Sequence, residues 1–470
     1  MITTERGRLD HSLGAKLEDV GDTAPRASLL DTIFTCSALV IYGGALISPL
    51  RILRGVGPQL VGDSEPVMAA CQTIILLVLL VVMTMRWQRF LSSLKMVVPY
   101  IVIIAICIMS TLWSDHPLST LRRGVTLGIC VMFGVYCYDA FGLRRLIHIL
   151  SFVAMSLAVL SLLAYFMMPQ IGREQAIEYN DAMRGVFAQK NGMAEYMLLG
   201  IVCRSYIFIE NMRLVPFCLS VALLYSCIVL AHSVTSLLIA TIVLITTVWL
   251  VVRDKPRVRL AFGFAASSTF LLLISGIVLM PDQMFEALGR DETLTGRLPL
   301  WNLVISAIAE RPLLGHGYSG FWDANSIDVQ YLWQRAGWMA PDSHNGYLDI
   351  MLQIGVLGIA LYGWLWVRVL RLGWKAWQSG TLPIAAWIIL FMMVNLMVNL
   401  DEGPLPWADE FTAAGPAVLI TLERWNKSHR RSGLQGGQRG LTQQQPVQQV
   451  TSVRTKSAAA QSGHGIYGNG

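Results

Sequence analysis

Long apolar runs recur along this chain, and they constrain its fold more than any other feature. Each run is long enough to cross about 30 Å of hydrocarbon as a helix. Lipid offers backbone groups no hydrogen-bonding partner, and the runs lack the alternation of barrel strands, so they predict transmembrane helices. About twelve spans can be placed, near residues 31–50, 67–85, 96–113, 124–141, 146–168, 192–210, 214–231, 234–252, 259–280, 345–370, 383–400 and 408–423.

The composition agrees with an all-α polytopic membrane protein. Of the 470 residues, 54% are hydrophobic and only 14% are charged, whereas soluble domains have about 25% charged residues. The formal charge of +6 comes from basic residues scattered through short loops and the C-terminal tail, so nothing indicates nucleic-acid binding. The eight cysteines lie inside apolar runs, and none pairs with a histidine at metal-ligand spacing, so they indicate neither a zinc site nor disulfides.

The basic residues between the runs predict that both termini are cytoplasmic. Residues 1–30 are polar and mixed in charge, which is unlike a cleavable signal peptide and fits a cytoplasmic segment. Residues 31–423 would form the membrane domain, and the Gln-, Gly- and Ser-rich tail within 424–470 would be disordered. The loops assigned to the cytoplasm contain Arg86, Arg89, Lys95, Arg144, Arg145, Arg253, Lys255, Arg257, Arg259, Arg368, Arg371 and Lys375.

This orientation leaves one long loop, residues 281–343, on the outer face, and so long a loop without a function would be unusual. Within it, Leu298, Trp301, Ile305 and Ile308 recur at helical spacing. They predict an amphipathic helix over 298–310, ended by Arg311-Pro312. We expect this helix to lie along the membrane surface and to cover a cavity.

His344 stands directly before an apolar run, in the sequence Asp342-Ser343-His344-Asn345. Asp342 or Ser343 would be a natural N-cap for the helix that follows. A helix N-terminus favours neutral imidazole, which suits a general base near neutral pH. The alternative is that these residues only cap the helix and that His344 is solvated.

Several cations fall on the same outer side, against the usual excess of positive charge inside. Arg297 begins the predicted amphipathic helix, where an arginine and the first-turn amides would suit a phosphate; the alternative is an ordinary surface or snorkelling arginine. Phosphate binding would also explain the other four cations, and the alternatives are chance, an interfacial anchor or an inverted fourth span. These four are Arg122 and Arg123 in SDHPLSTLRRG, and Arg184 and Lys190 in RGVFAQKN.

The remaining polar residues give weaker signals. Gly315-His316-Gly317-Tyr318 predicts a turn, in which His316 has a structural role rather than that of a ligand. The acidic pairs at 401–402 and 409–410 could hold a cation or orient sugar hydroxyls, although solvated loop charge is their default interpretation. Together, the outer cations and His344 predict a basic cavity with one base, suited to a lipid-linked phosphate.

These motifs resemble the O-antigen ligase/polymerase superfamily of Wzy- and WaaL-like membrane proteins. The segments WSDHPLSTLRRG and RGVFAQKN are most similar to ExoQ-type exopolysaccharide polymerases. The resemblance covers roughly residues 110–365 in pieces. The matching residues are Gly296-Arg297, Trp301, Arg311-Pro312-Leu313-Leu314-Gly315-His316-Gly317, Phe321, His344-Asn345, Tyr347-Leu348, Gly355 and Gly358.

The resemblance implies a GT-C-like membrane glycosyltransferase that needs no metal or other cofactor. It would use an undecaprenyl-pyrophosphate-linked oligosaccharide at the outer face of the bacterial inner membrane. One departure is that many relatives have Ser-Arg where this chain reads Ala231-His232-Ser233-Val234-Thr235-Ser236, so His232 or another cation would have to replace that arginine. Carried over residue by residue, His344 and Arg297 would be catalytic, and Arg184 matches an arginine in an earlier loop. Arg184, Lys190, Arg122, Arg123 and Asn345 are the candidates for binding pyrophosphate or sugar.

The sequence therefore predicts a polymerase that joins lipid-linked repeat units into exopolysaccharide, with inversion at the anomeric carbon. A ligase that transfers glycan to lipid A core or another acceptor would use the same residues. A polysaccharide-unit flippase is the non-enzyme alternative, although transporters usually have charged or broken helices near mid-membrane. Membrane lipid, a chain-length regulator and export machinery are the further partners that such a polymerase implies.

Overall fold

The computed structural model describes residues 27–55, 66–174, 181–252, 255–258, 260–261, 263, 297–380, 382–400, 402–403 and 408–442. The chain divides into two compact units, Met1–Trp425 and Asn426–Gly470, and the first contains everything discussed below. Most of the expected span at 259–280, the start of the outer loop at 281–296 and the tail from 443 onward lie outside the described residues, as do residues 1–26.

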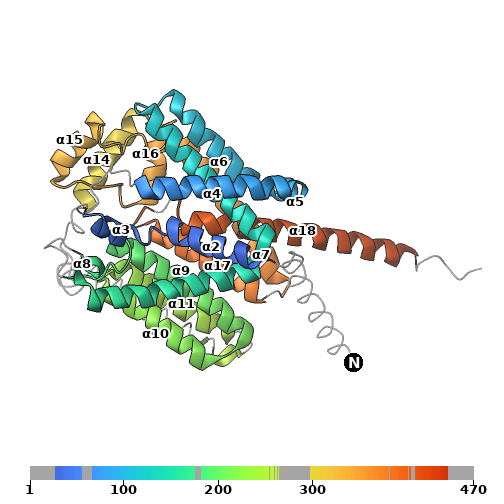
Figure 1. The fold of residues 1–470 in the computed structure, drawn as a ribbon. Helices are drawn as coiled ribbons and strands as arrows, with labels where there is room; N and C mark the ends of the chain where they lie inside the picture. Colours follow the sequence, from blue (N-terminus) through green and yellow to red (C-terminus); the bar gives the residue numbers. More distant parts are fainter. Residues whose placement is uncertain are drawn as a thin grey trace, which may run out of the picture. The chain divides into compact units, whose positions relative to one another are not determined.

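The described part of the chain is helical, apart from the isolated bridges Ala45–Phe187 and Arg173–Met183. The helices of its first half are α2 (Leu29–Tyr42), α3 (Ile47–Leu53), α4 (Pro66–Met85), α5 (Trp87–Leu94), α6 (Val98–Met109), η1 (Ser110–Leu112), α7 (Pro117–Met167), α8 (Pro169–Gly172), α9 (Lys190–Asn211) and α10 (Leu214–Leu230). The others are α11 (Val234–Val251), α14 (Arg297–Glu310), α15 (Ile327–Ala336), α16 (Gly346–Gln378), α17 (Leu382–Val398) and α18 (Glu410–Thr442) (Figure 1).

The helices support a multi-pass membrane protein. Among the described residues, α7, α9, α11 and α16 are long and apolar enough to cross a membrane. A fifth span results if α4 and α5, bent by 104° between residues 85 and 87, count as one. The shorter apolar helices α2, α6 with η1, α10 and α17 fall on four more of the expected runs. The total of twelve spans stays a prediction.

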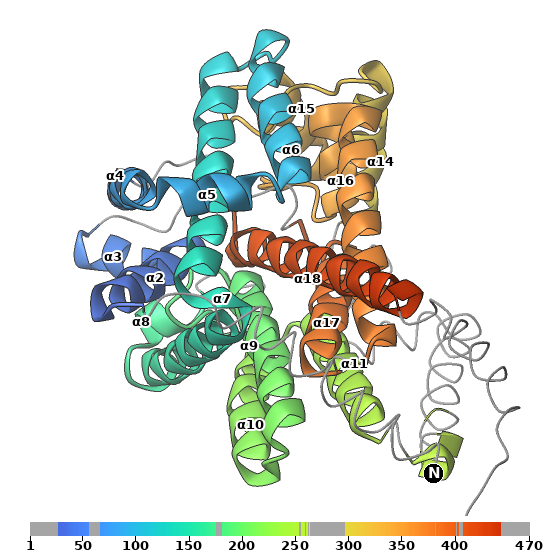
Figure 2. The same cartoon turned by 90° about the vertical axis from the view of Figure 1, so that its right-hand side faces the viewer.

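Helix α7 joins two of the expected spans without a loop between them. Its 51 residues are continuous except at Gly142, where φ is 67° and ψ is 170°. That backbone region is open essentially to glycine alone, so the chain changes direction at this residue. Figure 2 shows the two arms of α7 pointing in different directions. Arg144 and Arg145, which were expected in a loop, begin the second arm.

The core of this unit forms around α9. This helix packs against α7, α10, α11 and α17 (Figure 1). Met193, Tyr196 and Met197 on it are fully buried, as expected for a helix that is apolar on most of its circumference. At Gly200, a Cβ atom would lie 2.8 Å from the Cβ of Ala154, so this glycine allows α7 and α9 to approach closely.

Helix α16 is also broken, and a loop fills the break. Gly355 has φ 68° and ψ −159°, and a side chain there would collide with the main chain of Leu313. The amides of Val356 and Leu357 donate to the carbonyls of Pro312 and Leu313, while the amides of His316 and Gly317 donate to Leu352 and Gln353. The loop at 312–317 thus satisfies backbone groups that the break would leave without partners. The turn predicted at Gly315–Tyr318 is confirmed.

The helix predicted over 298–310 is confirmed as α14, but the expected apolar face was partly wrong. Leu300 and Val304 are buried, whereas Leu298 and Ile305 are 41% and 52% exposed. The helix is apolar on more than one side, so its sequence pattern alone does not choose a face. Packing against α15 and α16 makes that choice.

Candidate functional site

Four segments meet at the carboxylate of Glu402, in the stretch between α17 and α18. Its Oε1 accepts hydrogen bonds from Arg297 Nη2 at 2.7 Å and from Asn191 Nδ2 at 2.6 Å. Its Oε2 lies 3.0 Å from His344 Nδ1. The side chains of Glu402, Arg297 and His344 are only 8–12% exposed. Two groups that the sequence placed in the outer loop therefore share one buried acidic partner.

The start of α16 is fixed against the segment that contains Glu402. The amide of Gly346 donates to the carbonyls of Asn399 and Glu402 at 3.0 and 3.2 Å. A side chain at Gly346 would overlap the Asn399 amide, so glycine permits this close approach. His344, two residues earlier, has φ 48°. This left-handed conformation is uncommon for a residue other than glycine, and it occurs often at functional sites.

Asn345 caps α16, which corrects the expectation that Asp342 or Ser343 does so. Its side-chain oxygen accepts from the amides of Tyr347 and Leu348, both at 3.1 Å, and its Nδ2 donates to the Leu400 carbonyl. Both ends of the Asn345 amide thus hold the local fold, and its predicted contact with substrate stays a prediction. Asp342 instead accepts the His344 amide at 2.8 Å.

The environment of His344 raises the pKa of its imidazole. Burial by itself would lower this pKa, but the carboxylates of Asp342 and Glu402 outweigh burial and hold the pKa of His344 above its ordinary value. The helix N-terminus was expected to favour the neutral ring, and the two acidic neighbours, which that expectation left out, act in the opposite direction. The Trp338 ring lies 5.6 Å from the imidazole and covers part of it.

Glu402 has the opposite shift. Burial would raise its pKa, yet His344 and Arg297 beside it hold the pKa of Glu402 below its ordinary value. The carboxylate is thus ionised near neutral pH and accepts the proton on His344 Nδ1, which leaves Nε2 as the nitrogen that can exchange protons. A carboxylate of this kind fixes the tautomer and orientation of an imidazole and stabilises its charged form.

Lys190 and Arg184 lie on the segment that leads into α9. Lys190 directly precedes Asn191, and its backbone amide donates to Glu174 at 2.8 Å. Arg184 is buried, with its guanidinium on the carbonyls of Ile171 and Gln170 at 3.0 and 3.1 Å. Arg184 is therefore held by main-chain oxygens, and it is Asn191 in this segment that contacts Glu402.

The turn between α10 and α11 lies beside the loop that contains Arg184. The Met183 amide donates to the Leu230 carbonyl at 2.8 Å, and His232 follows in this turn with its side chain exposed. His232 was expected to replace an arginine of relatives. The fold places the turn that contains it next to the loop of the predicted phosphate-binding Arg184.

Arg122 and Arg123 lie in the first arm of α7. Arg122 is exposed, whereas Arg123 donates to the hydroxyl and the carbonyl of Ser319, in the loop between α14 and α15. These bonds attach α7 to that loop. The structure thus places Arg297 and His344 against Glu402, and Lys190 is adjacent in sequence to Asn191, which also contacts Glu402. Arg123 contacts Ser319 instead.

Sequence reasoning missed two members of the site, Glu402 and Asn191. The default interpretation of Glu402 as solvated loop charge was wrong, because its side chain is buried. The signal that could have found Glu402 is charge balance, because several cations on the outer side need a counter-ion if they are buried. Its neighbour Asp401 lies outside the described residues. Among the residues that are described, one group has metal-ligand proximity, namely Asp115, His316 and Asp328, and it shares no member with this site.

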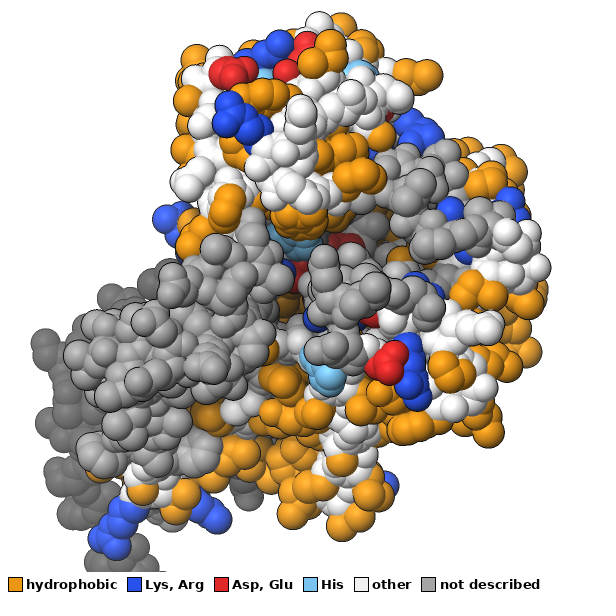
Figure 3. All heavy atoms as spheres, turned by 90° about the vertical axis from the view of Figure 1, so that its left-hand side faces the viewer, with side chains coloured by type: hydrophobic (Ala, Val, Ile, Leu, Met, Phe, Trp, Pro, Cys, Tyr) orange, Lys and Arg blue, Asp and Glu red, His pale blue; other side chains and the backbone are white. Residues whose placement is uncertain are grey.

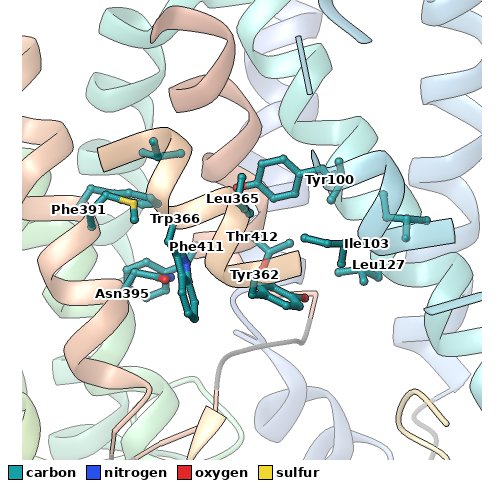
Figure 4. A pocket seen from close by; sticks show the side chains of 14 residues that line it. Tyr100, Ile103, Leu127, Tyr362, Leu365, Trp366, Phe391, Asn395, Phe411 and Thr412 are labelled. Atoms are coloured by element: carbon teal, nitrogen blue, oxygen red, sulfur yellow. The ribbon is translucent and has the colours of Figure 1, made fainter. Parts of the chain in front are cut away.

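Figure 3 shows the face on the left-hand side of Figure 1, where histidine and acidic side chains are visible below hydrophobic ones near the middle of the view. A separate hollow lies between α6, α7, α16, α17 and α18. Its lining is mainly aromatic and aliphatic, with Asn395 and Thr412 as polar members (Figure 4), and it includes none of the predicted site residues.

Comparison with known proteins gives this geometry a family. Residues 219–363, which include Arg297 and His344, match the family model described as O-antigen ligase. This region is similar to the O-antigen ligase family. The resemblance drawn from the motifs is confirmed by this match, and the long apolar helices agree with a multi-pass membrane protein.

Two curated relatives agree with the O-antigen ligase match. The exopolysaccharide production protein ExoQ of Rhizobium meliloti is 27% identical over 269 residues, which are 53% of this chain and 59% of that protein. The O-antigen ligase of Pseudomonas aeruginosa is 25% identical over 207 residues, which are 43% of this chain and 46% of that protein. The chain thus matches about half the length of each relative.

Proposed function

We propose that this protein is a membrane glycosyltransferase that polymerises lipid-linked oligosaccharide repeat units into exopolysaccharide. The observation that carries the proposal is the buried contact of Glu402 with both His344 and Arg297. It supplies an oriented base and a fixed cation side by side, which are the two groups that transfer from a sugar pyrophosphate needs. Similarity to the O-antigen ligase family and to ExoQ supports a lipid-linked glycan as the substrate.

In this mechanism, His344 Nε2 removes the proton from an acceptor hydroxyl on one repeat unit. The hydroxyl oxygen then forms a bond to the anomeric carbon at the reducing end of the growing chain, with inversion. The bond between that carbon and the phosphate oxygen breaks, and undecaprenyl pyrophosphate leaves with the electron pair. Glu402 stabilises the imidazolium that forms, and an oriented general base of this kind accelerates a reaction by about 10²–10⁴-fold.

Arg297 would meet the charge that develops on the departing pyrophosphate. Its guanidinium has five N–H donors, and the bond to Glu402 uses Nη2. Removing one fixed donor to a developing oxyanion costs about 3–4 kcal/mol in other enzymes. Arg184, Lys190, Arg122 and Arg123 are proposed as further contacts to phosphate or sugar, and Asn345 as one to sugar.

The proposed setting is the periplasmic face of the bacterial inner membrane, with both termini in the cytoplasm. This orientation puts the starts of α14 and α16, and so the site, on the outer side. The lipid-linked substrate would enter from the outer leaflet, and a chain-length regulator and export machinery would be the protein partners.

A ligase is the second candidate, because the relative from Pseudomonas aeruginosa is named an O-antigen ligase. Both reactions would use His344 and Arg297, and they differ in the acceptor. A flippase is less well supported, since Glu402, Arg297 and His344 lie in the segments between the apolar helices or at their ends. A transporter would need such charges within its spans.

The test is an in vitro assay of the purified protein on undecaprenyl-pyrophosphate repeat units without another acceptor. Extended lipid-linked chains from the wild type, lost in His344→Ala and Arg297→Ala, would support the polymerase. His148→Ala is the matched control, because His148 also faces a glutamate, Glu210 at 3.6 Å, but is 45% exposed outside the site. Transfer only when lipid A core is added would indicate the ligase, and full activity in both variants would overturn the mechanism.

A further inference from the structure

Three segments bring metal-binding side chains together near the break in α16. Asp115 precedes α7, His316 lies in the loop that fills the break, and Asp328 is in the first turn of α15. One ligand atom from each lies within 4.8 Å of the other two. Exposed carboxylates are common on protein surfaces, so their proximity alone is weak evidence for a metal site. The burial and hydrogen bonding of His316 are therefore the deciding observations.

The His316 ring is set up as a ligand. The residue is 2% exposed, and its Nε2 lies 2.9 Å from the Ala307 carbonyl, which can only accept a hydrogen bond. The hydrogen of the neutral ring is therefore on Nε2, and Nδ1 has the lone pair. This Nδ1 atom is buried, and among the residues that the structure describes it has no hydrogen-bond partner. Histidine ligands of metals are commonly oriented by such a carbonyl on their other nitrogen.

The charges also favour a cation. Asp115 and Asp328 supply two negative charges, and the nearby Arg311 supplies one positive charge through its pairing with Asp115 at 3.1 Å. The remaining excess is negative. A carboxylate has about four lone-pair directions, so Asp115 can contact Arg311 and still bind a metal ion through another direction. Both aspartates are exposed. Asp115 is held by Arg311 through both of its oxygens, Oδ2 at 3.1 Å and Oδ1 at 3.2 Å, so Asp328 is the one with more freedom to turn toward His316.

We propose that Asp115, His316 and Asp328 bind one Zn²⁺ ion. One imidazole nitrogen and two carboxylate oxygens are a ligand set that zinc accepts, with water in the fourth position. Ligand atoms of a tetrahedral zinc site lie about 3.4 Å apart for bonds of about 2.0–2.1 Å, so the two aspartates need to move closer by a little over an ångström. The ion would connect the start of α7 and the start of α15 to the loop that fills the break in α16. This proposal is independent of the glycosyltransferase proposal.

The experiment measures Zn²⁺ binding to the full chain, purified with a tag that contains no histidine and treated first with EDTA. Competition with a chromophoric chelator gives stoichiometry and affinity, and Co²⁺ absorption spectra report the ligand set. We expect one site per chain that Asp328→Asn and Asp115→Asn each weaken by about 10–100-fold. Because His316 is buried and His316→Ala could fail to fold, the exposed Asp328→Asn variant is the main test, and its folding is checked by thermal melting.

Asp323→Asn is the matched control. Asp323 is in the same loop and faces His116 at 3.9 Å, but it is not one of the three proposed ligands. Arg311→Gln should tighten Zn²⁺ binding, because it removes the competing positive charge. No binding to the wild type, or equal binding by the wild type and Asp328→Asn, would overturn the proposal. Weakening by Asp323→Asn equal to that by Asp328→Asn would do the same, since it would reflect general surface charge.

Discussion

Two histidines lie near the N-terminal part of α16 without belonging to it, and their rings have different hydrogen-bonding partners. His344 precedes the helix and its Nδ1 is on the Glu402 carboxylate, whereas His316 is beside the break and its Nε2 is on the Ala307 carbonyl. A carboxylate stabilises the charged imidazole and raises its pKa, which suits proton transfer. A carbonyl fixes the tautomer without supplying a charge, which suits a metal ligand. The partner, rather than the residue type, thus distinguishes a base from a ligand.

The largest effect is expected from removing the charge of Glu402, which distinguishes the surroundings of His344 from those of His316. Glu402→Gln should lower the rate of glycan extension by about 10³-fold, because the imidazole loses the group that orients it and stabilises its charged form. The rate is measured on lipid-linked repeat units with equal amounts of folded protein. Glu310→Gln, at the exposed end of α14, is the control and should leave the rate unchanged. If Glu402→Gln retained wild-type activity, the proposed distinction between the two histidines would fail.

Gly355→Ala tests whether the broken helix holds both histidines in place. Alanine at φ 68° and ψ −159° should cost about 3 kcal/mol of stability, in addition to a collision with the Leu313 backbone. Gly363→Ala, in the same helix with open space around it, should be neutral or slightly stabilising. Thermal melting in detergent micelles compares the two variants. Equal melting temperatures would show that the loop does not depend on the break.

The pH dependence of the glycan-transfer rate is a further test of the difference between His344 and His316. If His344 acts as a base, the rate should rise by about tenfold per pH unit on the acidic side and level off above its pKa. Because Asp342 and Glu402 raise the pKa of His344, the midpoint should lie above the ordinary value for histidine. In Glu402→Gln, the midpoint should move to lower pH, since the amide no longer stabilises the imidazolium. A midpoint that stays in place in this variant would exclude His344 as the titrating group.

Chelation should have the smallest effect on transfer. EDTA should lower the melting temperature of the zinc-loaded protein by a few degrees, because an ion bound only to the folded state stabilises it by mass action. The initial rate of transfer should change by less than about twofold, since the proposed ion supports a loop and not the reacting atoms. Restoring Zn²⁺ should restore the melting temperature. A transfer rate that fell to background with EDTA would mean that the reaction at the Glu402 site depends on the ion bound by Asp115, His316 and Asp328.

Much of the fold could be predicted from local pattern alone. Apolar runs gave the long helices, and Arg311-Pro312 marked the end of α14, because hydrophobicity and proline act through the nearest residues. The bend at Gly142 was missed, since a lone glycine in an apolar run does not show its φ angle. Glu402 was missed for a related reason. Its burial depends on Arg297, which is 105 residues earlier, and no local pattern reports so distant a partner.

The position of Glu402 in the chain also affects how the protein is made. The ribosome produces Asn191, Arg297 and His344 first, and Glu402 follows them by 211, 105 and 58 residues. Until α17 has been inserted, the nascent protein therefore lacks the anion that its arginine and histidine need before they can be buried. A buried charge without its partner costs about 3–5 kcal/mol. A product truncated before residue 402 would keep this penalty, so quality control in the cell could distinguish incomplete chains from finished ones at this point.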